Sequence, residues 1–269
     1  MSSFTTSDGV RLDYVESGDP AGRAVVLVAG FKAAATSWRY QLPVLASAGY
    51  RVIAFDRRGH GTSEAPAHGA TMLRHGADLR ELLEHLALDD AVLVGGSMGG
   101  NTIWATVAQS GTARMAGIVI VDQTPRMLNG DGWEHGFYDY DDATRDTAFA
   151  TTIPDPGRHP LRRKGLVRIV RLLRAMSGGG GGRGFTAPEL ELLNDHAKAD
   201  WRAAIASADV PVLFVAGAES EFWPASHAAA AAALAPRGRS LVIPRDGHPA
   251  NIEQPRAFND ALLGFLREL

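Results

Sequence analysis

The hydrophobic residues of this chain fall into short, nearly continuous runs, and longer stretches with helical periodicity separate them. Such runs are typical of strands buried on both faces, as in a parallel sheet covered by helices. An amino-terminal hairpin over Phe4–Val15 is predicted to precede them, because Asp8-Gly9 is a strong turn dipeptide. The expected buried strands are Ala24–Ala29, Val52–Phe55, Ala91–Val94, Ile118–Val121, Val212–Ala216 and Leu241–Ile243.

Helix-like stretches lie between and after these strands. Alternation of strand and helix favours right-handed crossovers and a doubly wound α/β sheet. We therefore expect residues 1–123 and 210–269 to form one α/β core. The expected helices are Ser37–Ala48, Leu73–Leu88, Met98–Ser110, Ser226–Leu234 and Ala257–Leu266.

The alternation stops over residues 124–209, which contain no convincing strand. Leu161–Met176 predicts an amphipathic helix with apolar residues on one side and basic residues on the other, and we expect the basic side to be solvated. The glycine-rich run Ser177–Gly184 predicts a flexible joint. Thr186–Glu189 is typical of a capping box that begins the next helix. This segment is therefore predicted to be a helical cap over the carboxyl ends of the strands.

Composition narrows the class of protein. The chain has 269 residues, a net charge of −3 and no cysteine, which excludes disulfides and thiolate metal sites. Near-balanced charge gives no sign of a nucleic acid or membrane partner. Neither a signal peptide nor a membrane-spanning run is present, so we expect a soluble cytoplasmic protein. No motif predicts a metal or nucleotide site, and we expect no cofactor; a homodimer stays open.

The most informative motif is a serine between glycines, at the end of the expected strand Ala91–Val94. Ser97 is the centre of Gly95-Gly-Ser97-Met-Gly99, and a helical stretch follows at once. Gly-x-Ser-x-Gly between a strand and a helix is typical of a nucleophile elbow. The serine would project at a helix N-terminus, where backbone N–H groups favour negative charge. Ser97 is therefore the candidate nucleophile.

A serine nucleophile needs a base, and the base needs an orienting acid. His248 follows the last expected strand and lies after the serine, which fits the order serine, acid, histidine. The acid has two candidate locations. Ser220 stands where an aspartate would be expected, between Glu219 and Glu221. Asp122 ends the strand beside the nucleophile strand, and we favour it because a buried carboxylate needs a partner.

The oxyanion hole needs two N–H donors. We expect them from Met98, which follows the nucleophile, and from Phe31 in the loop after the first buried strand. Lys32 is interpreted as solvent-facing. Aromatic residues gather soon after Asp122, where the cap would cover the site. The candidate substrate-binding residues are Trp133, Phe137, Tyr138 and Trp223.

With these motifs the chain resembles the α/β-hydrolase superfamily, in its esterase and cofactor-free haloperoxidase branch. Asp56-Arg-Arg-Gly59-His60-Gly61-Thr-Ser63 is similar to a loop common after the fourth strand of that fold, and the resemblance implies a structural His60. Gly30-Phe31 is similar to its oxyanion loop. The resemblance implies a mostly parallel eight-stranded sheet flanked by helices, with a cap inserted after strand 6. The superfamily also includes members whose acid follows strand 6, which is where Asp122 falls in this chain.

The expected activity is hydrolysis of carboxylic esters or lactones of an apolar, aromatic or cyclic small molecule, through an acyl-enzyme on Ser97. Perhydrolysis and cofactor-free oxygenation would use the same histidine and acid. Dehalogenase and epoxide hydrolase chemistry is disfavoured, because both need an aspartate at position 97. A hydrolase-like binding protein is the non-enzymatic alternative.

Overall fold

The computed structural model describes residues 1–160, 164–176 and 184–269. Among them, eight strands form one sheet in the order β1-β2-β4-β3-β5-β6-β7-β8. The first two strands form the predicted hairpin, and β2 also pairs antiparallel with β4; the remaining pairs are parallel. The strands are β1 (Ser2–Thr5), β2 (Arg11–Gly18), β3 (Ala24–Val28), β4 (Arg51–Phe55), β5 (Ala91–Gly96), β6 (Met115–Val121), β7 (Val212–Gly217) and β8 (Gly238–Ile243).

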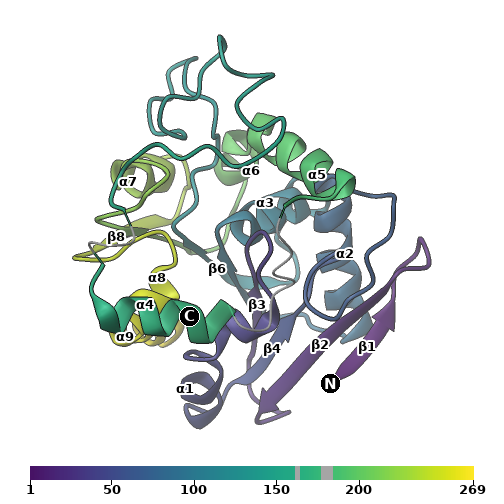
Figure 1. The fold of residues 1–269 in the computed structure, drawn as a ribbon. Helices are drawn as coiled ribbons and strands as arrows, with labels where there is room; N and C mark the ends of the chain where they lie inside the picture. Colours follow the sequence, from purple (N-terminus) through teal and green to yellow (C-terminus); the bar gives the residue numbers. More distant parts are fainter. Residues whose placement is uncertain (161–163, 177–183) are drawn as a thin grey trace.

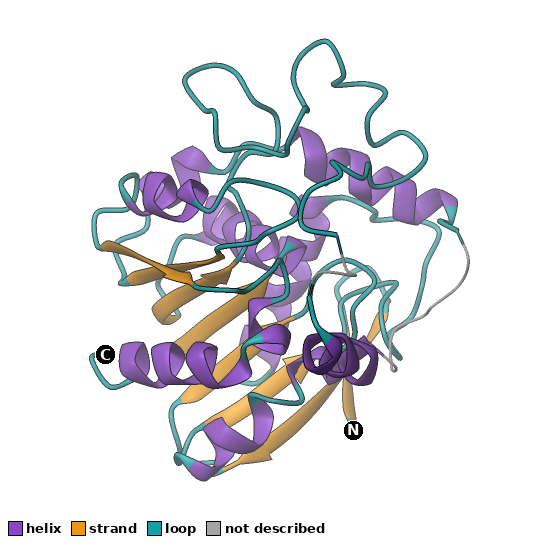
Figure 2. Ribbon diagram, turned by 60° about the vertical axis from the view of Figure 1, so that its left-hand side comes forward, coloured by secondary structure: helices purple, strands orange, loops and turns teal. Residues whose placement is uncertain are grey.

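Helices cover both faces of the sheet (Figures 1 and 2). One face carries α2 (Met72–His85), α3 (Met98–Ser110) and α7 (Ser226–Ala232). The other carries the 3-10 helix η1 (Ala35–Trp38), α1 (Leu42–Ser47), α8 (Ala250–Glu253) and α9 (Pro255–Leu266). None of the described helices is long and apolar enough to cross a membrane.

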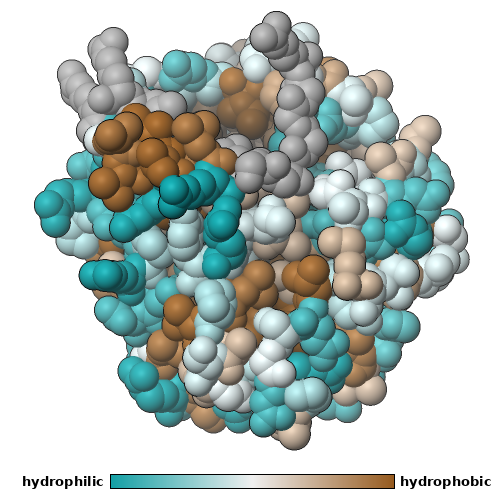
Figure 3. All heavy atoms as spheres, turned by 60° about the horizontal axis from the view of Figure 1, so that its bottom comes forward, coloured by the Kyte–Doolittle hydropathy of each residue, from teal (hydrophilic) through white to brown (hydrophobic). Residues whose placement is uncertain are grey.

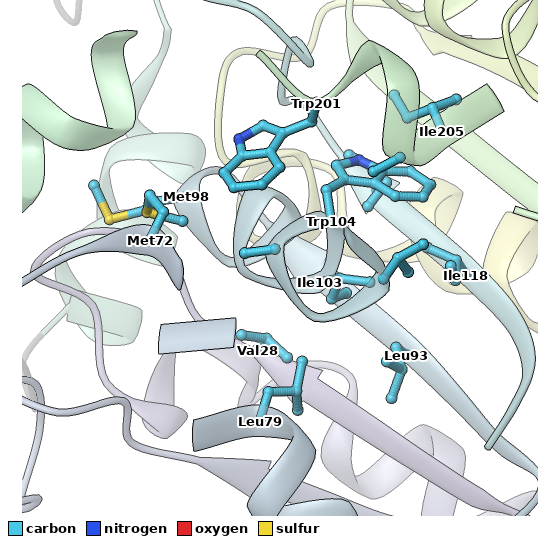
Figure 4. Close-up of a cluster of buried hydrophobic side chains, with 14 of the residues drawn as sticks. Val28, Met72, Leu79, Leu93, Met98, Ile103, Trp104, Ile118, Trp201 and Ile205 are labelled. Atoms are coloured by element: carbon cyan, nitrogen blue, oxygen red, sulfur yellow. The ribbon is translucent and has the colours of Figure 1, made fainter. Parts of the chain in front are cut away.

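Alternating residues of the central strands face two separate cores, because successive side chains of a strand point to opposite faces. In β3, Val26 and Val28 join the core under α2 and α3, which Figure 4 shows around Trp104. Val25 and Leu27 join the core under α1 and α9. The apolar runs of the central strands are therefore covered on both sides, as predicted. The expected buried strand Leu241–Ile243 differs, because β8 is the edge of the sheet and its Leu241 and Val242 are exposed.

One expected helix is divided. Ser37–Ala48 forms η1 and then α1 rather than one continuous helix. Pro43 lies in the first turn of α1, where its missing N–H is tolerated, whereas it could not continue a helix that began at Ser37.

The insertion between β6 and β7, residues 124–209, lies mainly at the carboxyl end of the sheet (Figures 1 and 2). Residues 124–160 form turns and loops. The sequence analysis predicted a helical cap over the whole insertion, and this part of that prediction is wrong. Three helices follow: α4 (Leu166–Met176), α5 (Ala187–Lys198) and α6 (Arg202–Ala206). The predicted capping box begins α5, with both of its hydrogen bonds formed between Thr186 and Glu189. Most of the predicted glycine joint, and residues 161–163 of the predicted helix, lie outside the described residues.

Helix α4 is oriented opposite to the expectation. Its large apolar residues Leu166 and Leu173 are 76% and 68% exposed. Figure 3 shows hydrophobic surface gathered on this face. Its basic side, with Lys164 just before the helix and Arg168 within it, instead packs against the core, and the Lys164 side chain is 4% exposed. The basic side is therefore not a solvated face, because carboxylates of the core, among them the fully buried Glu253, pair with it.

Candidate active site

Ser97 occupies a sharp turn between β5 and α3. Its backbone has φ 52° and ψ −133°, a strained conformation for a residue with a side chain. The flanking glycines make the turn possible. A Cβ on Gly95 would lie 2.5 Å from the nitrogen of Gly100, and one on Gly99 would overlap the carbonyl oxygen of Val28. The Ser97 N–H donates to the carbonyl of Val121 over 2.9 Å, which ties the turn to β6.

His248 lies within hydrogen-bonding distance of the serine. Its Nε2 is 2.8 Å from Ser97 Oγ, and the residue sits in the loop between β8 and α8. Two aromatic rings pack edge-on against the imidazole, Phe222 at 4.6 Å and Trp223 at 5.1 Å between ring centres. The imidazole is therefore held against the serine by packing as well as by hydrogen bonds.

Asp122 completes the line of hydrogen bonds. It lies directly after β6, and its Oδ2 is 2.8 Å from His248 Nδ1. The carboxylate is fully buried and also accepts the Gly217 N–H at 2.9 Å, the Ser220 hydroxyl at 2.6 Å and His227 Nε2 at 3.3 Å. Asp122 has a φ of 46°, in the left-handed region that is uncommon for a residue with a side chain.

These donors decide the charge of Asp122. Burial on its own would raise the pKa of the carboxyl, but the hydrogen bonds and charges of His227 and His248 outweigh it and hold the pKa well below its usual range. Asp122 is therefore ionised at neutral pH and can orient an imidazole. The sequence analysis singled out Ser220 only as a missing aspartate, and nothing in the sequence distinguished His227 from the other histidines.

The alternative acids point elsewhere. Glu219 pairs with Arg168 at 2.9 Å, and Glu221 pairs with Lys164. Glu221 does reach His248, but it accepts the backbone N–H, at 2.8 Å, rather than the imidazole. Of the three candidate carboxylates, Asp122 is the one in contact with the histidine ring.

The two expected oxyanion donors flank the serine. Met98 is the first residue of α3, and the first N–H groups of a helix have no partner within it. Phe31 follows Gly30, where a Cβ would lie 3.0 Å from the Cβ of Ser97. Lys32 is not solvent-facing as expected. Its side chain is 21% exposed, pairs with Glu189 of α5 at 3.2 Å and lies over the ring of Phe185 at 4.9 Å.

A buried arginine supports the Phe31 loop. Arg57 donates to the carbonyls of Ala29 at 3.0 Å and Gly30 at 2.9 Å, and to ring nitrogens of His75 and His60 at 3.0 and 3.1 Å. Burial, followed by the charge of Arg57, lowers the pKa of both histidines well below the ordinary value. Two neutral histidines thus accept from one guanidinium, and the sequence analysis did not foresee this network.

The predicted substrate-binding residues occupy different places. Trp223 packs on His248, and Phe137 packs on Trp223 at 6.4 Å. Tyr138 is half-buried with Arg158 over its ring at 4.6 Å. Trp133 is buried and donates to the Thr124 hydroxyl at 3.1 Å. Trp223 therefore packs directly on the histidine and Phe137 packs behind Trp223, whereas Trp133 contacts residues of the insertion, Thr124 and His135.

A largely apolar cavity lies between the loop after β4 and α5. Its volume is about 280 Å³, and neither Ser97 nor His248 is among its lining residues. His60 lines it and packs edge-on against Phe31, with 5.9 Å between ring centres. Ala70 and Leu192 add apolar walls from the core and from α5. Over the described ranges, no group of three or more histidine and acidic residues is suited to hold a metal ion.

This chain is similar to known proteins along most of its length. A family model described as the alpha/beta hydrolase fold matches residues 23–178. A non-heme chloroperoxidase of Streptomyces lividans is 30% identical over 99% of this chain and all of its own length. A bromoperoxidase structure from Bacillus anthracis is 26% identical with a TM-score of 0.78, covering 99% of this chain and 100% of its own. An esterase structure from Exiguobacterium antarcticum, 20% identical, has a TM-score of 0.81 and covers 99% of both chains. The chain therefore belongs to the alpha/beta hydrolase fold family, in the branch that holds esterases and non-heme haloperoxidases.

Proposed function

We propose that this protein is a serine hydrolase that cleaves carboxylic esters or lactones through an acyl-enzyme on Ser97. The observation that carries the proposal is the unbroken line of hydrogen bonds from Ser97 through His248 to Asp122, at 2.8 Å in each step. A hydroxyl, an imidazole and a buried ionised carboxylate in this order are what nucleophilic acyl transfer requires.

Acylation begins when Ser97 Oγ attacks the substrate carbonyl carbon and His248 Nε2 takes the hydroxyl proton. Asp122 keeps the other imidazole proton on Nδ1 and stabilises the imidazolium that forms. The carbonyl oxygen becomes negative and accepts hydrogen bonds from the Phe31 and Met98 N–H groups. The tetrahedral intermediate then collapses, and His248 returns the proton to the leaving alkoxide. The alcohol of an ester departs, whereas the hydroxyl freed from a lactone stays on the acyl chain until deacylation.

Deacylation repeats these steps with water. His248 removes a proton from a water molecule, whose oxygen attacks the acyl carbon. Collapse of the second intermediate breaks the bond to Ser97 Oγ, and the serine regains its proton from the imidazolium. The acid product then leaves, and the free enzyme is restored.

The substrate is proposed to be an apolar, aromatic or cyclic ester or lactone. Phe222 and Trp223 pack on the histidine, and Phe137 packs on both of them. An apolar cavity lies beside His60, which contacts Phe31. Trp133 and Tyr138 remain predicted contacts from the same insertion. We propose that residues 124–209 form a cap that covers the substrate.

Perhydrolysis is the second candidate. It is favoured by the 30% identity to a protein named as a non-heme chloroperoxidase along the whole chain. The same acyl-enzyme would transfer its acyl group to hydrogen peroxide instead of water and release a peracid. Both reactions share every residue of the site and differ in the second acceptor.

Hydrolysis of p-nitrophenyl esters of increasing acyl length by wild type and Ser97→Ala tests the proposal. We expect turnover that depends on Ser97 and covalent labelling by a fluorophosphonate. A second series with added hydrogen peroxide measures partition of the acyl-enzyme between the two acceptors. A folded wild-type protein that neither turns over esters nor reacts with the fluorophosphonate would refute acyl transfer at Ser97.

A further inference from the structure

A cluster of ion pairs around the fully buried Glu253 lies beside the loop that carries the catalytic histidine. Lys164 pairs with both Glu221 and Glu253, and Arg168 pairs with Glu253 and, at 2.9 Å, with Glu219. The two cations belong to the insertion, at and before α4, while the three carboxylates belong to the core. Glu253 is fully buried and the Lys164 side chain is 4% exposed, so water screens these charges poorly.

The carboxylates of this cluster also hold the loop that carries the histidine. Glu253 Oε2 accepts the Gly247 N–H at 3.0 Å, and Glu221 Oε2 accepts the His248 N–H at 2.8 Å. Gly247 itself is tightly enclosed, since a Cβ there would lie 2.9 Å from Glu221 Oε2 and 3.0 Å from Glu253 Oε2. Two successive backbone N–H groups are thus fixed by two carboxylates.

Each of these carboxylates depends on a cation from the insertion. Without Lys164 and Arg168, Glu221 and Glu253 would face each other across Gly247, and Glu253 would be a buried charge with no cationic partner in the cluster. Repulsion would then separate them, and the loop between them would lose its fixed position. Packing of α4 against α8 is therefore linked to the place of the imidazole.

We propose that Glu221 and Glu253, held in place by Lys164 and Arg168, are positioning residues that keep His248 in line between Asp122 and Ser97. The proposal rests on the proposed function, in which His248 is the base. Packing of α4 against the core then positions the imidazole that acts as the base in acyl transfer. The insertion thus contributes to the chemical step as well as covering the substrate.

The test compares Lys164→Met with Lys198→Met. Lys198 also forms an ion pair within the insertion, with Asp146 at 2.6 Å, but this pair is exposed and distant from the loop. We expect Lys164→Met to lower kcat about 10- to 100-fold with little change in KM, the cost of misplacing a reacting group. Lys198→Met should keep kcat within about twofold. Thermal unfolding of both variants shows that they are folded.

A pair of substitutions at Glu221 separates positioning from general stability. Glu221→Gln keeps an oxygen that can accept the His248 N–H, whereas Glu221→Ala removes it. We expect the alanine variant to lose about 10-fold or more in kcat and the glutamine variant to recover most of that loss. Equal loss in both variants would overturn the assignment of that hydrogen bond.

An NMR measurement tests the positioning of His248 without substrate turnover. The proton on His248 Nδ1, bound to Asp122, gives an NMR resonance whose exchange with water reports how firmly the ring is held. We expect faster exchange in Lys164→Met than in wild type or Lys198→Met. If exchange and kcat are unchanged in Lys164→Met, the proposal is wrong. If wild type shows no serine-dependent turnover but Lys164→Met still speeds exchange, the proposed function fails while the positioning role stands.

Discussion

Asp246 is a buried carboxyl whose titration should set the pH dependence of stability. It lies two residues before His248, is fully buried, and neither of its carboxyl oxygens has a hydrogen-bond partner among the described residues. Burial, together with the charges of Glu253 and Asp122, raises the pKa of Asp246 from 3.8 to about 8. The group is therefore protonated in the folded protein at neutral pH and ionised in the unfolded chain.

The sign and size of the effect follow from this difference. Since the folded-state pKa is the higher one, the contribution to stability is fully present below about pH 4 and is lost as the pH rises towards 8. In that window the folded protein binds one more proton than the unfolded chain, so stability falls by about 1.4 kcal/mol per pH unit. Asp246→Asn cannot titrate. The free energy of unfolding of the variant, minus that of wild type, should thus grow by about 2.5 kcal/mol between pH 5 and pH 7.

Urea unfolding of both proteins at the two pH values measures this difference, with the denaturant slope compared to ensure that the unfolded states match. Asp142→Asn, an exposed site in the insertion, controls for loss of a surface aspartate. The difference in free energy of unfolding between Asp246→Asn and wild type could instead stay constant within about 0.5 kcal/mol from pH 5 to pH 7. That result would refute the reasoning, because it would mean that Asp246 is ionised in the folded protein at pH 7.

Three further outcomes are expected. Asp122→Asn should lower kcat by about 10⁴-fold, because the amide favours the wrong imidazole tautomer, whereas Glu219→Gln and Glu221→Gln should each lower kcat less than about tenfold. Steady-state ester hydrolysis ranks the three variants by kcat, and the reverse order would contradict the choice of Asp122 as the acid. Ser220→Asp added to Asp122→Asn should restore at least tenfold in kcat, since Ser220 Oγ lies 2.6 Å from the carboxylate that it would replace; no gain would show that the loop cannot aim an acid at His248. Arg57→Met should lower kcat about 10- to 100-fold with KM nearly constant, because the loop that carries the Phe31 N–H loses its support. A change confined to KM would contradict a role of this loop in stabilising the oxyanion.

The sequence predicted the sheet and the nucleophile well, because both leave strong local signals. Continuous apolar runs correspond to the central strands, and the glycines around Ser97 are required by a turn in which a Cβ at Gly95 or Gly99 would meet the backbone. The choice of Asp122 over Glu219 and Glu221 came from its place after a buried strand, and the structure puts its carboxylate 2.8 Å from His248 Nδ1.

Contacts between distant segments could not be predicted in the same way. His227 and Ser220 reach Asp122 from about 100 positions away along the chain, and neither carries a local pattern that indicates it. Helix α4 shows most clearly what a sequence pattern cannot predict. Its amphipathic pattern is real, but periodicity does not say which side is buried, and here the carboxylates of Glu221 and Glu253 draw the basic side inward.

The neighbouring ends of β6 and β7 converge on one carboxylate, and this has an evolutionary consequence. Asp122 comes from β6, while Gly217 and Ser220 donate to it from the end of β7 and the turn beyond. A lineage could therefore move its acid from one strand to the other by two single replacements, with the histidine never changing place. The intermediate would carry acids on both strands and share one proton between them, as closely spaced carboxylates do. Chains of this family with the acid on different strands would then be separated by few mutational steps rather than by a rebuilt active site.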